Sequence, residues 1–326
     1  MFGSNSTLAQ VTPDTTLGSE SSVVTPNVEE RGVMSDRVNG GAIRGANLFH
    51  SFQEFNVREG SGIYFSNPQG IENILSRVTG ANRSEILGRL GVLGNANLFL
   101  INPNGIVFGQ NASLDVEGSF VATTANAIRL GETGLFSASE PASGNLLSIN
   151  PSALFYNVLA KEAAIVNRSQ EGLSVRDGRS LLLVGGKVNL ESGVIKAPSG
   201  RVELGGLDAP GTVAFNKDGN NLGLSFPEGV GRADVLLTKS SSSSNGSEVS
   251  VRAGGNGSIA INARNVEISG GSSLRGGIGE GLDLLVLLRG ILHSMLPEQS
   301  RSNNKEVLLK IVLVLELQAK RGIFSL

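Results

Sequence analysis

The sequence predicts an all-β protein folded as a parallel β-helix, and two features of the residue pattern carry that prediction. From Val11 to about Gly281 the chain is a succession of short apolar or alternating runs, each closed by Gly, Asn, Pro or Ser. This pattern is typical of many short strands joined by turns. Three such runs and a fourth that repeats the first fill residues 180–206, SLLLVGGKVNLESGVIKAPSGRVELGG. A repeat of roughly 20 residues that carries several strands is what one coil of a β-helix requires.

Within each coil, the Leu, Val and Ile side chains at alternate positions are expected to point inward, and the intervening Ser, Asn, Arg and Glu side chains to face solvent. Coils of this size that stack at the strand spacing of about 4.8 Å would turn ~270 residues into a rod roughly 60 Å long. A β-sandwich is the second choice, because its strands are longer and it has fewer paired glycines.

Residues 11–60 are expected to form a cap over the first coil, with His50 as a structural side chain in the apolar run 47–52. An open coil end has unpaired strand edges, and covering it prevents edge-to-edge association with another chain. Residues 82–90 are expected to form a short helix, because Ile86, Leu87 and Leu90 would share one helical face.

The glycine-rich pattern stops after Gly281, where the apolar runs 282–288 and 307–317 follow. Neither run has the ~18 to 20 apolar residues that a membrane span requires. A pair of amphipathic helices and a foreign, frameshifted tail are both compatible with these runs, and the abrupt change of composition favours the tail. We therefore divide the chain into residues 1–10, a β-helix at 11–281 and a foreign tail at 282–326. Residues 1–10 are expected to be disordered or the remnant of a signal peptide, since Thr7-Leu8-Ala9 has the form of a cleavage site without the preceding basic and apolar regions.

The composition excludes several classes of site. The chain has no cysteine, only two histidines (His50 and His293) and a formal net charge of −2, with 27 basic and 29 acidic residues interspersed. Disulfides, thiolate nucleophiles and cysteine zinc sites are absent, and no basic face indicates a nucleic-acid partner. The Asp residues are scattered, although stacking one coil apart could still bring carboxylates such as Glu191 together. We therefore expect no catalytic residue, metal or cofactor, with a polysaccharide-binding or polysaccharide-cleaving β-helix as the alternative.

One turn motif, Asn102-Pro103-Asn104-Gly105, is followed directly by the apolar Ile106. Proline presets φ near −65° for a turn, asparagine tolerates left-handed geometry and glycine supplies a positive φ. The motif is therefore expected to reverse the chain between two short strands.

A related turn motif has glutamine at its third position, which gives it less weight. It comprises Asn67, Pro68, Gln69 and Gly70.

Two segments are similar to the N-terminal secretion domain of filamentous haemagglutinin-type exoproteins of two-partner secretion, in its cyanobacterial form. They are GANLFHSFQEFNVREGSGIYFSNPQGIENILSRVTG at 45–80 and NANLFLINPNGIVFGQNASLDVEGSFVATTANAI at 95–128. The resemblance continues through SLLLVGGKVNLESG and RVELGGL to the neighbourhood of Gly281. It implies a right-handed, pectin-lyase-like parallel β-helix with an N-terminal cap, in which Asn-Pro-Asn-Gly is a hallmark motif.

The resemblance also implies a function. The domain would pass through an outer-membrane β-barrel transporter with periplasmic recognition domains and then fold outside the cell, stacking coils on the first one. It would be a non-enzymatic secretion signal and scaffold of a haemagglutination-active adhesin, a monomer, with a host or surface glycan as a further partner. The expected transporter-recognition residues are Asn102, Pro103, Asn104, Gly105 and Ile106, together with Asn67, Pro68 and Gly70. A role of these residues in folding alone is at least as well supported.

The same family places the intact protein outside the cell or on its surface. This chain has no recognisable signal peptide, which predicts that it stays in the cytoplasm. A third hypothesis follows, in which the chain is a decayed remnant with no exported role.

Overall fold

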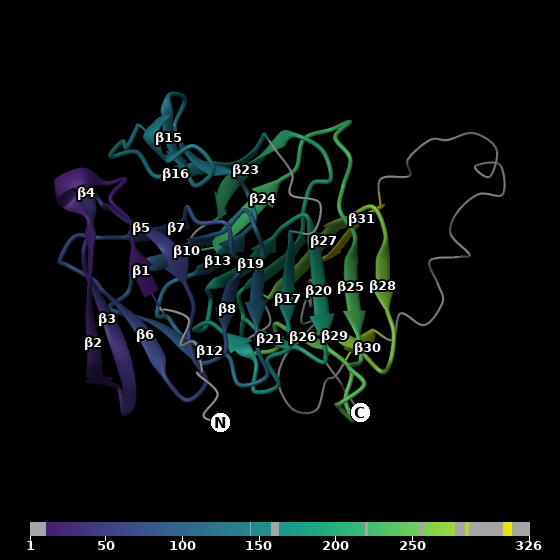
Figure 1. Cartoon of the computed structure of the whole chain (residues 1–326). Coiled ribbons are helices and arrows are strands. Elements are labelled where there is room, and N and C mark those ends of the chain that lie inside the picture. Colours follow the sequence, from purple (N-terminus) through teal and green to yellow (C-terminus); the bar gives the residue numbers. More distant parts are fainter. Residues whose placement is uncertain are drawn as a thin grey trace, which may run out of the picture.

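The computed structural model describes residues 11–143, 145–157, 163–218, 221–253, 257–277, 284–286 and 309–314. These residues form a parallel β-helix whose coils stack side by side along the molecule (Figure 1), which confirms the predicted fold class. Ser180 pairs in parallel with Arg201, which lies 21 positions later, so the predicted repeat is one coil of the helix.

Each coil contributes one strand to each of three faces, except that the first coil joins face 2 through a single bridge between Val57 and Ile86. Face 1 consists of β5 (Asn47–Phe55), β7 (Asn73–Val78), β10 (Asn97–Ile101), β13 (Phe120–Thr123), β19 (Ser180–Val184), β22 (Arg201–Gly205) and β27 (Ser258–Ala263). Face 2 consists of β8 (Ser84–Ile86), β11 (Ile106–Phe108), β17 (Ala164–Asn167), β20 (Lys187–Glu191), β25 (Val235–Thr238) and β28 (Val266–Ile268). Face 3 consists of β3 (Val33–Gly40), β6 (Gly62–Ser66), β9 (Arg89–Leu93) and β12 (Ser113–Asp115), followed by β18 (Leu173–Ser174), β21 (Val194–Lys196), β26 (Glu248–Ser250) and β29 (Ser273–Gly276).

The interior of the coils is filled by aliphatic and phenylalanine side chains from all three faces. Leu181 and Leu183 of face 1, Val188 of face 2 and Ile195 of face 3 are fully buried in this one cluster. Removing such side chains from water is the main favourable contribution to folding. The predicted inward alternation therefore holds inside the coil.

A second, antiparallel sheet lies against the outer surface of face 1, and we call it the side sheet. It forms from two insertions between coils, β14 (Ala127–Leu130), β15 (Gly134–Ser137) and β16 (Pro151–Tyr156) from the first, and β23 (Gly211–Asp218) and β24 (Asn221–Ser225) from the second. Figure 1 shows these strands along one side of the stack. Phe99 and Leu182 of face 1 pack with Leu154 and Tyr156 of the side sheet in a separate buried cluster.

The side sheet corrects two expectations. Outward side chains of face 1 are covered rather than solvent-exposed, which is why its strands are apolar on both faces. The expected rod of roughly 60 Å is also too long, because the cap and the two insertions use residues that were assigned to coils, and because the first coils have 26 and 24 residues rather than about 20. Face 1 has seven parallel strands in the described residues, and their six spacings of about 4.8 Å give roughly 30 Å.

The N-terminal cap is present and consists of β1 (Val11–Pro13), the 3-10 turn η1 (Gly18–Glu20), β2 (Ser22–Glu30) and β4 (Ala42–Arg44). The expected range of 11–60 is too long, because β5 already pairs in parallel with β7 as the first strand of face 1. β1 and β4 pair antiparallel with β5, while β2 pairs antiparallel with β3. β2 is the outer strand of its sheet, and its register shifts between Thr25 and Val28, around Pro26. Proline and a bulge in an edge strand discourage pairing with another chain.

The helix expected at residues 82–90 is wrong. Residues 84–86 and 89–93 are the strands β8 and β9, and the side chains of Ile86 and Leu90 are buried in the coil interior. A short apolar run is compatible with the periodicity of a helix and with that of a strand. These segments form strands because they pair in parallel with the next coil.

The described parts of residues 282–326 are strands and not helices. β30 (Leu284–Val286) pairs antiparallel with β29, and β31 (Leu309–Val314) pairs antiparallel with β27. The remaining tail and residues 1–10 lie outside the described residues, so the proposed signal remnant and the boundary at 281 stay predictions. In the ranges that the structure describes, no helix has both the length and the hydropathy to span a membrane.

Candidate functional site

The Asn102 motif forms the corner at which the chain passes from β10 in face 1 to β11 in face 2. It is therefore a corner between two sheets, not a reversal between paired strands, which corrects the expected direction of the turn. Gly105 has a φ of 114° and donates its N–H to the carbonyl of Asn102 at 3.1 Å. Asn104 does not adopt a positive φ, so its contribution comes from its side chain.

The side chains of this corner connect it to the preceding coil. Asn102 is fully buried, and its Nδ2 donates to the carbonyl of Asn82 and to Ser84 Oγ, both at 3.0 Å. Asn104 Nδ2 donates to the carbonyl of Gly80 at 2.8 Å. The backbone N–H of Asn102 donates to the carbonyl of Thr123 in the following coil at 3.0 Å. One corner thus satisfies polar groups of three successive coils.

The Asn67 motif forms a different corner, between β6 in face 3 and β7 in face 1. Asn67 Nδ2 donates to the carbonyl of Ile71 at 3.1 Å, and its Oδ1 accepts the N–H of Ala96 at 3.0 Å. Gly70 has a φ of 84°, and the backbone from Pro68 to Gly70 is exposed. This corner precedes face 1 and the Asn102 corner follows it. The structure therefore does not bring the two predicted groups together.

An asparagine ladder at the start of face 1 escaped the sequence interpretation. Asn73 Nδ2 donates to Asn47 Oδ1 and Asn97 Nδ2 donates to Asn73 Oδ1, both at 3.0 Å. The ladder extends to the carbonyl of Ile149, which accepts from Asn47 Nδ2 at 2.8 Å, and to the N–H of Ser119. The sequence pattern could have predicted the ladder, because an asparagine is the first residue of three apolar runs that begin one coil apart.

Arg77 was also missed, and its guanidinium connects three parts of the molecule. Nε donates to Ser51 Oγ of the first coil, and one terminal nitrogen donates to Thr16 Oγ1 of the cap, both at 2.8 Å. The other terminal nitrogen donates to the carbonyl of Ser137 in the side sheet at 2.7 Å, and the guanidinium carbon lies 4.5 Å from the centre of the Phe136 ring. Arg77 is only 1% exposed, and burial lowers its pKa to about 10.

Asp14 supplies the negative charge that partly offsets this effect on the pKa of Arg77. Thr16 Oγ1 donates to Asp14 Oδ1 at 2.6 Å and Ser51 Oγ donates to Oδ2 at 2.8 Å, so the two charges are linked through hydroxyl groups. Burial alone would raise the pKa of Asp14, but hydrogen bonds from Thr16, Thr79 and Ser51 outweigh burial and lower it.

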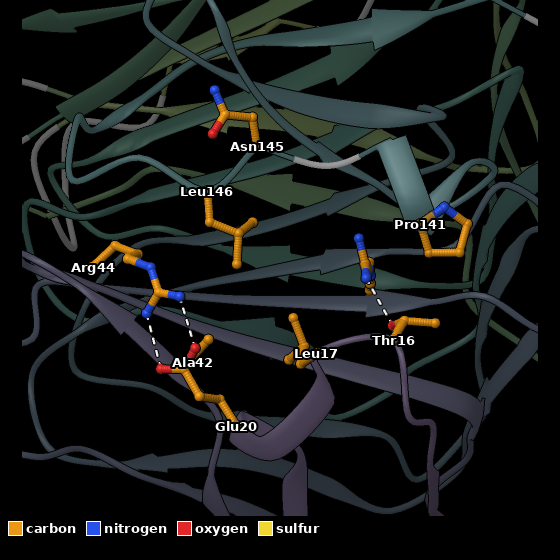
Figure 2. Close-up of a pocket in the computed structure, with 9 residues that line it drawn as sticks. Thr16, Leu17, Glu20, Ala42, Arg44, Pro141, Asn145 and Leu146 are labelled. Atoms are coloured by element: carbon orange, nitrogen blue, oxygen red, sulfur yellow. Dashed lines mark hydrogen bonds and ion pairs between the residues drawn. The ribbon is translucent and has the colours of Figure 1, made fainter.

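Arg77 lines a cleft between the cap and the side sheet, with a volume of about 310 Å³. At its rim, Arg44 donates to both carboxylate oxygens of Glu20, at 2.9 and 2.7 Å. Figure 2 shows this ion pair on one side of the cleft and Thr16 with Pro141 on the other. The complete lining is Thr16, Leu17, Glu20, Ala42, Arg44, Arg77, Pro141, Asn145 and Leu146.

The acidic side chains of the described residues were candidates for a metal site. Within the described ranges, no group of three or more His, Cys, Asp or Glu side chains is placed to hold a metal ion. Glu191, which stacking could have joined to another carboxylate, forms an ion pair with Arg168 at 2.8 Å. The absence of an enzyme activity stays a prediction.

His50 is fully buried in β5, and its ring lies against the rings of Phe52 and Phe65. Its Nδ1 lies 3.0 Å from Ser22 Oγ of the cap, and Nε2 has no hydrogen-bond partner among the described residues. Burial lowers the pKa of His50 to about 3, so the ring is neutral at physiological pH. This placement fits the structural role that the sequence predicts.

The buried His50 predicts that stability falls in mild acid. The unfolded ring gains a proton below pH ~6.5, whereas the folded ring resists it down to about 3. The free energy of unfolding should therefore be highest above pH 6.5 and decrease by up to about 1.4 kcal/mol per unit as the pH falls through this window.

Urea unfolding between pH 7 and about 5 measures this effect, because hydrogen-bonded carboxylates such as Asp14, whose pKa is lowered in the folded protein, reduce stability only below about pH 5. Wild type and His50→Phe should be compared in a His293→Asn background, so that at most one histidine titrates. The free energy of unfolding should depend less steeply on pH in His50→Phe than in the protein that keeps His50. Equal slopes in the two proteins would show that His50 is not the group responsible.

The fold and its corners show that the chain is a capped parallel β-helix domain with an attached side sheet. The family model of the TPS secretion domain matches residues 9–261. The chain therefore belongs to this family, the secretion domains of two-partner secretion exoproteins.

Two curated relatives are heme/hemopexin-binding proteins of Haemophilus influenzae. The one from strain ATCC 51907 / DSM 11121 / KW20 / Rd is 35% identical over 83 residues, which are 26% of this chain and 9% of that protein. The other is 32% identical over 81 residues, 25% of this chain and 8% of that protein. The match spans less than a tenth of the length of either relative.

Two crystal structures are also similar. The HMW1 secretion domain from Haemophilus influenzae is 20% identical with a TM-score of 0.45, covering 78% of this chain and 71% of that one. A filamentous hemagglutinin secretion domain is 16% identical with a TM-score of 0.46, covering 83% of this chain and 98% of that one.

Proposed function

We propose that this chain acts as the secretion signal and folding scaffold of a two-partner secretion exoprotein. Its partner is an outer-membrane β-barrel transporter with periplasmic recognition domains, and its first coils start β-helix folding outside the cell. Membership of the TPS secretion domain family supports the exported, non-enzymatic role and the transporter partner. A larger adhesin attached to this domain, and a glycan as its ligand, are further parts of the proposal.

The observation that carries the folding part is the burial of the Asn102 corner among three coils. Asn102 bonds to the coil before it through its side chain and to the coil after it through its backbone. Its side chain, like Gly105 and Ile106, is buried in the folded domain. The transporter therefore reads this motif in the unfolded chain, and the same residues then fix the corner once the chain has emerged.

The folding of each coil supplies a direction for transport. A coil that folds on the far side of the membrane buries its apolar side chains and pairs with the exposed edge of the coil before it. Folding at the exit therefore opposes return of the chain without nucleotide hydrolysis. The cap protects the first edge, so the chain grows from one end only.

Asn102→Ala tests the proposal in a strain that carries the transporter, with the same signal peptide fused to the wild-type chain and to every variant. Three polar partners lose their hydrogen bonds, so the free energy of unfolding of the purified chain should fall by about 1–3 kcal/mol. The amount of chain secreted should fall as well. Gln69→Ala is the control, because Gln69 lies exposed in the other corner and should affect neither quantity.

Secretion is measured with and without the transporter, for the full chain and for residues 11–281. Secretion that does not depend on the transporter would overturn the partner assignment. Normal secretion of a destabilised Asn102→Ala variant would overturn the link between corner formation and transport.

A further inference from the structure

We propose that the cleft between the cap and the side sheet binds a neutral sugar unit of a glycan. The cleft lies where η1, β4 and β7 meet the loop that follows β15. Its volume of about 310 Å³ is at the small end of ligand sites and suits a single sugar ring. This inference deepens the glycan part of the proposed function, but it does not rest on the secretion role, because it concerns only the folded domain.

The charges of the cleft balance each other. Arg44 and Glu20 form a bidentate ion pair at the rim, and Arg77 is linked to Asp14 through the hydroxyl groups of Thr16 and Ser51. A cleft with paired charges of both signs attracts neither an anion nor a cation strongly. The ligand that fits is therefore uncharged.

The lining offers both donors and acceptors around an apolar centre. The guanidinium of Arg44 donates, the carboxylate of Glu20 accepts, and the side-chain amide of Asn145 can do both. Figure 2 shows the side chains of Leu17 and Leu146 between the polar groups. Sugar hydroxyls donate and accept at the same time, while the C–H face of the ring packs on apolar side chains. The lining matches this combination.

The cleft forms only in the folded domain. Leu17 and Glu20 belong to the cap, whereas Asn145 and Leu146 lie 125 or more positions later, in the first insertion. Arg77, beneath both, holds the cap and the insertion together through Thr16 and Ser137. Binding thus requires that both segments have docked, which an exported and folded protein fulfils.

Saturation-transfer NMR on the full chain tests the proposal with the methyl glycosides of glucose, galactose, mannose and N-acetylglucosamine. At least one should bind with a Kd on the order of 1 mM, as expected for a ligand of this size. Free glucuronate provides the anionic comparison. The variants Asn145→Ala and Glu20→Gln should weaken binding at least about fivefold, and Leu146→Trp, which fills the cleft, should abolish it. Circular dichroism confirms that each variant is folded.

The matched control is Asn111→Ala, an exposed asparagine in the corner between β11 and β12 that should leave binding unchanged. No saturation by any glycoside at tens of millimolar would overturn the proposal. Tighter binding of glucuronate than of every neutral glycoside would overturn the assignment of an uncharged ligand. Binding that the three cleft variants do not change would overturn the location.

Discussion

Gly206→Ala is expected to destabilise the protein by about 3 kcal/mol or more, and so to abolish cooperative folding if the coil stack is only marginally stable. A methyl group at this position would overlap the backbone carbonyl oxygen of Gly185 in the preceding coil. Gly206 does not have a positive φ, so alanine could adopt its backbone conformation. The cost is therefore steric, and neither coil can move without breaking the ladder that joins β19 and β22.

Gly178→Ala provides the matched control, because the added methyl group has room there but the backbone has a positive φ. Gly178 has a φ of 69°, and a methyl group there would meet no atom within 4 Å. Its cost should be about 1 kcal/mol, the ordinary penalty for a non-glycine residue in left-handed geometry. Urea unfolding of both variants measures the difference. A Gly206→Ala variant no less stable than Gly178→Ala would show that the coils are not packed as closely as the structure indicates.

The glycines that end the coil strands also illustrate what the sequence can predict. Gly186 and Gly206 close corresponding runs one coil apart, and this local recurrence was enough to predict the β-helix and its repeat. The side sheet could not be predicted in the same way. Its strands have the same length and composition as coil strands, and only the distant pairing of β16 with β23 separates them from the coils.

The candidate sites follow the same division between local and distant information. The corner at Asn102 was predictable because its turn residues are contiguous, although its partners at Gly80, Asn82 and Ser84 were not. Arg77 carries no local signal, since an arginine next to a short apolar run is expected to face solvent. Its burial results from a cap before it and an insertion after it, both of which return to cover face 1.

Arg77 is therefore expected to control the docking of the cap and the side sheet on the first coils. Arg77→Met keeps much of the side-chain length but removes every N–H donor. Ser51 Oγ, Thr16 Oγ1 and the Ser137 carbonyl each lose a partner. Asp14 also loses its compensating charge. Breaking a buried charged network from one side costs about 3–5 kcal/mol, and we expect a loss in this range.

The control is Arg83→Met, whose side chain is 60% exposed and pairs with the exposed Glu85. Such a surface pair contributes about 0–1 kcal/mol, so the free energy of unfolding should hardly change. Hydrogen exchange also shows where the protein is destabilised. In Arg77→Met, protection should fall first in β1 and in the β14–β15 hairpin, because the guanidinium no longer bonds to Thr16 beside β1 or to Ser137 in β15, while the later coils keep their ladders. Uniform loss of protection along all coils would mean that Arg77 supports the whole stack rather than the docking of these two segments.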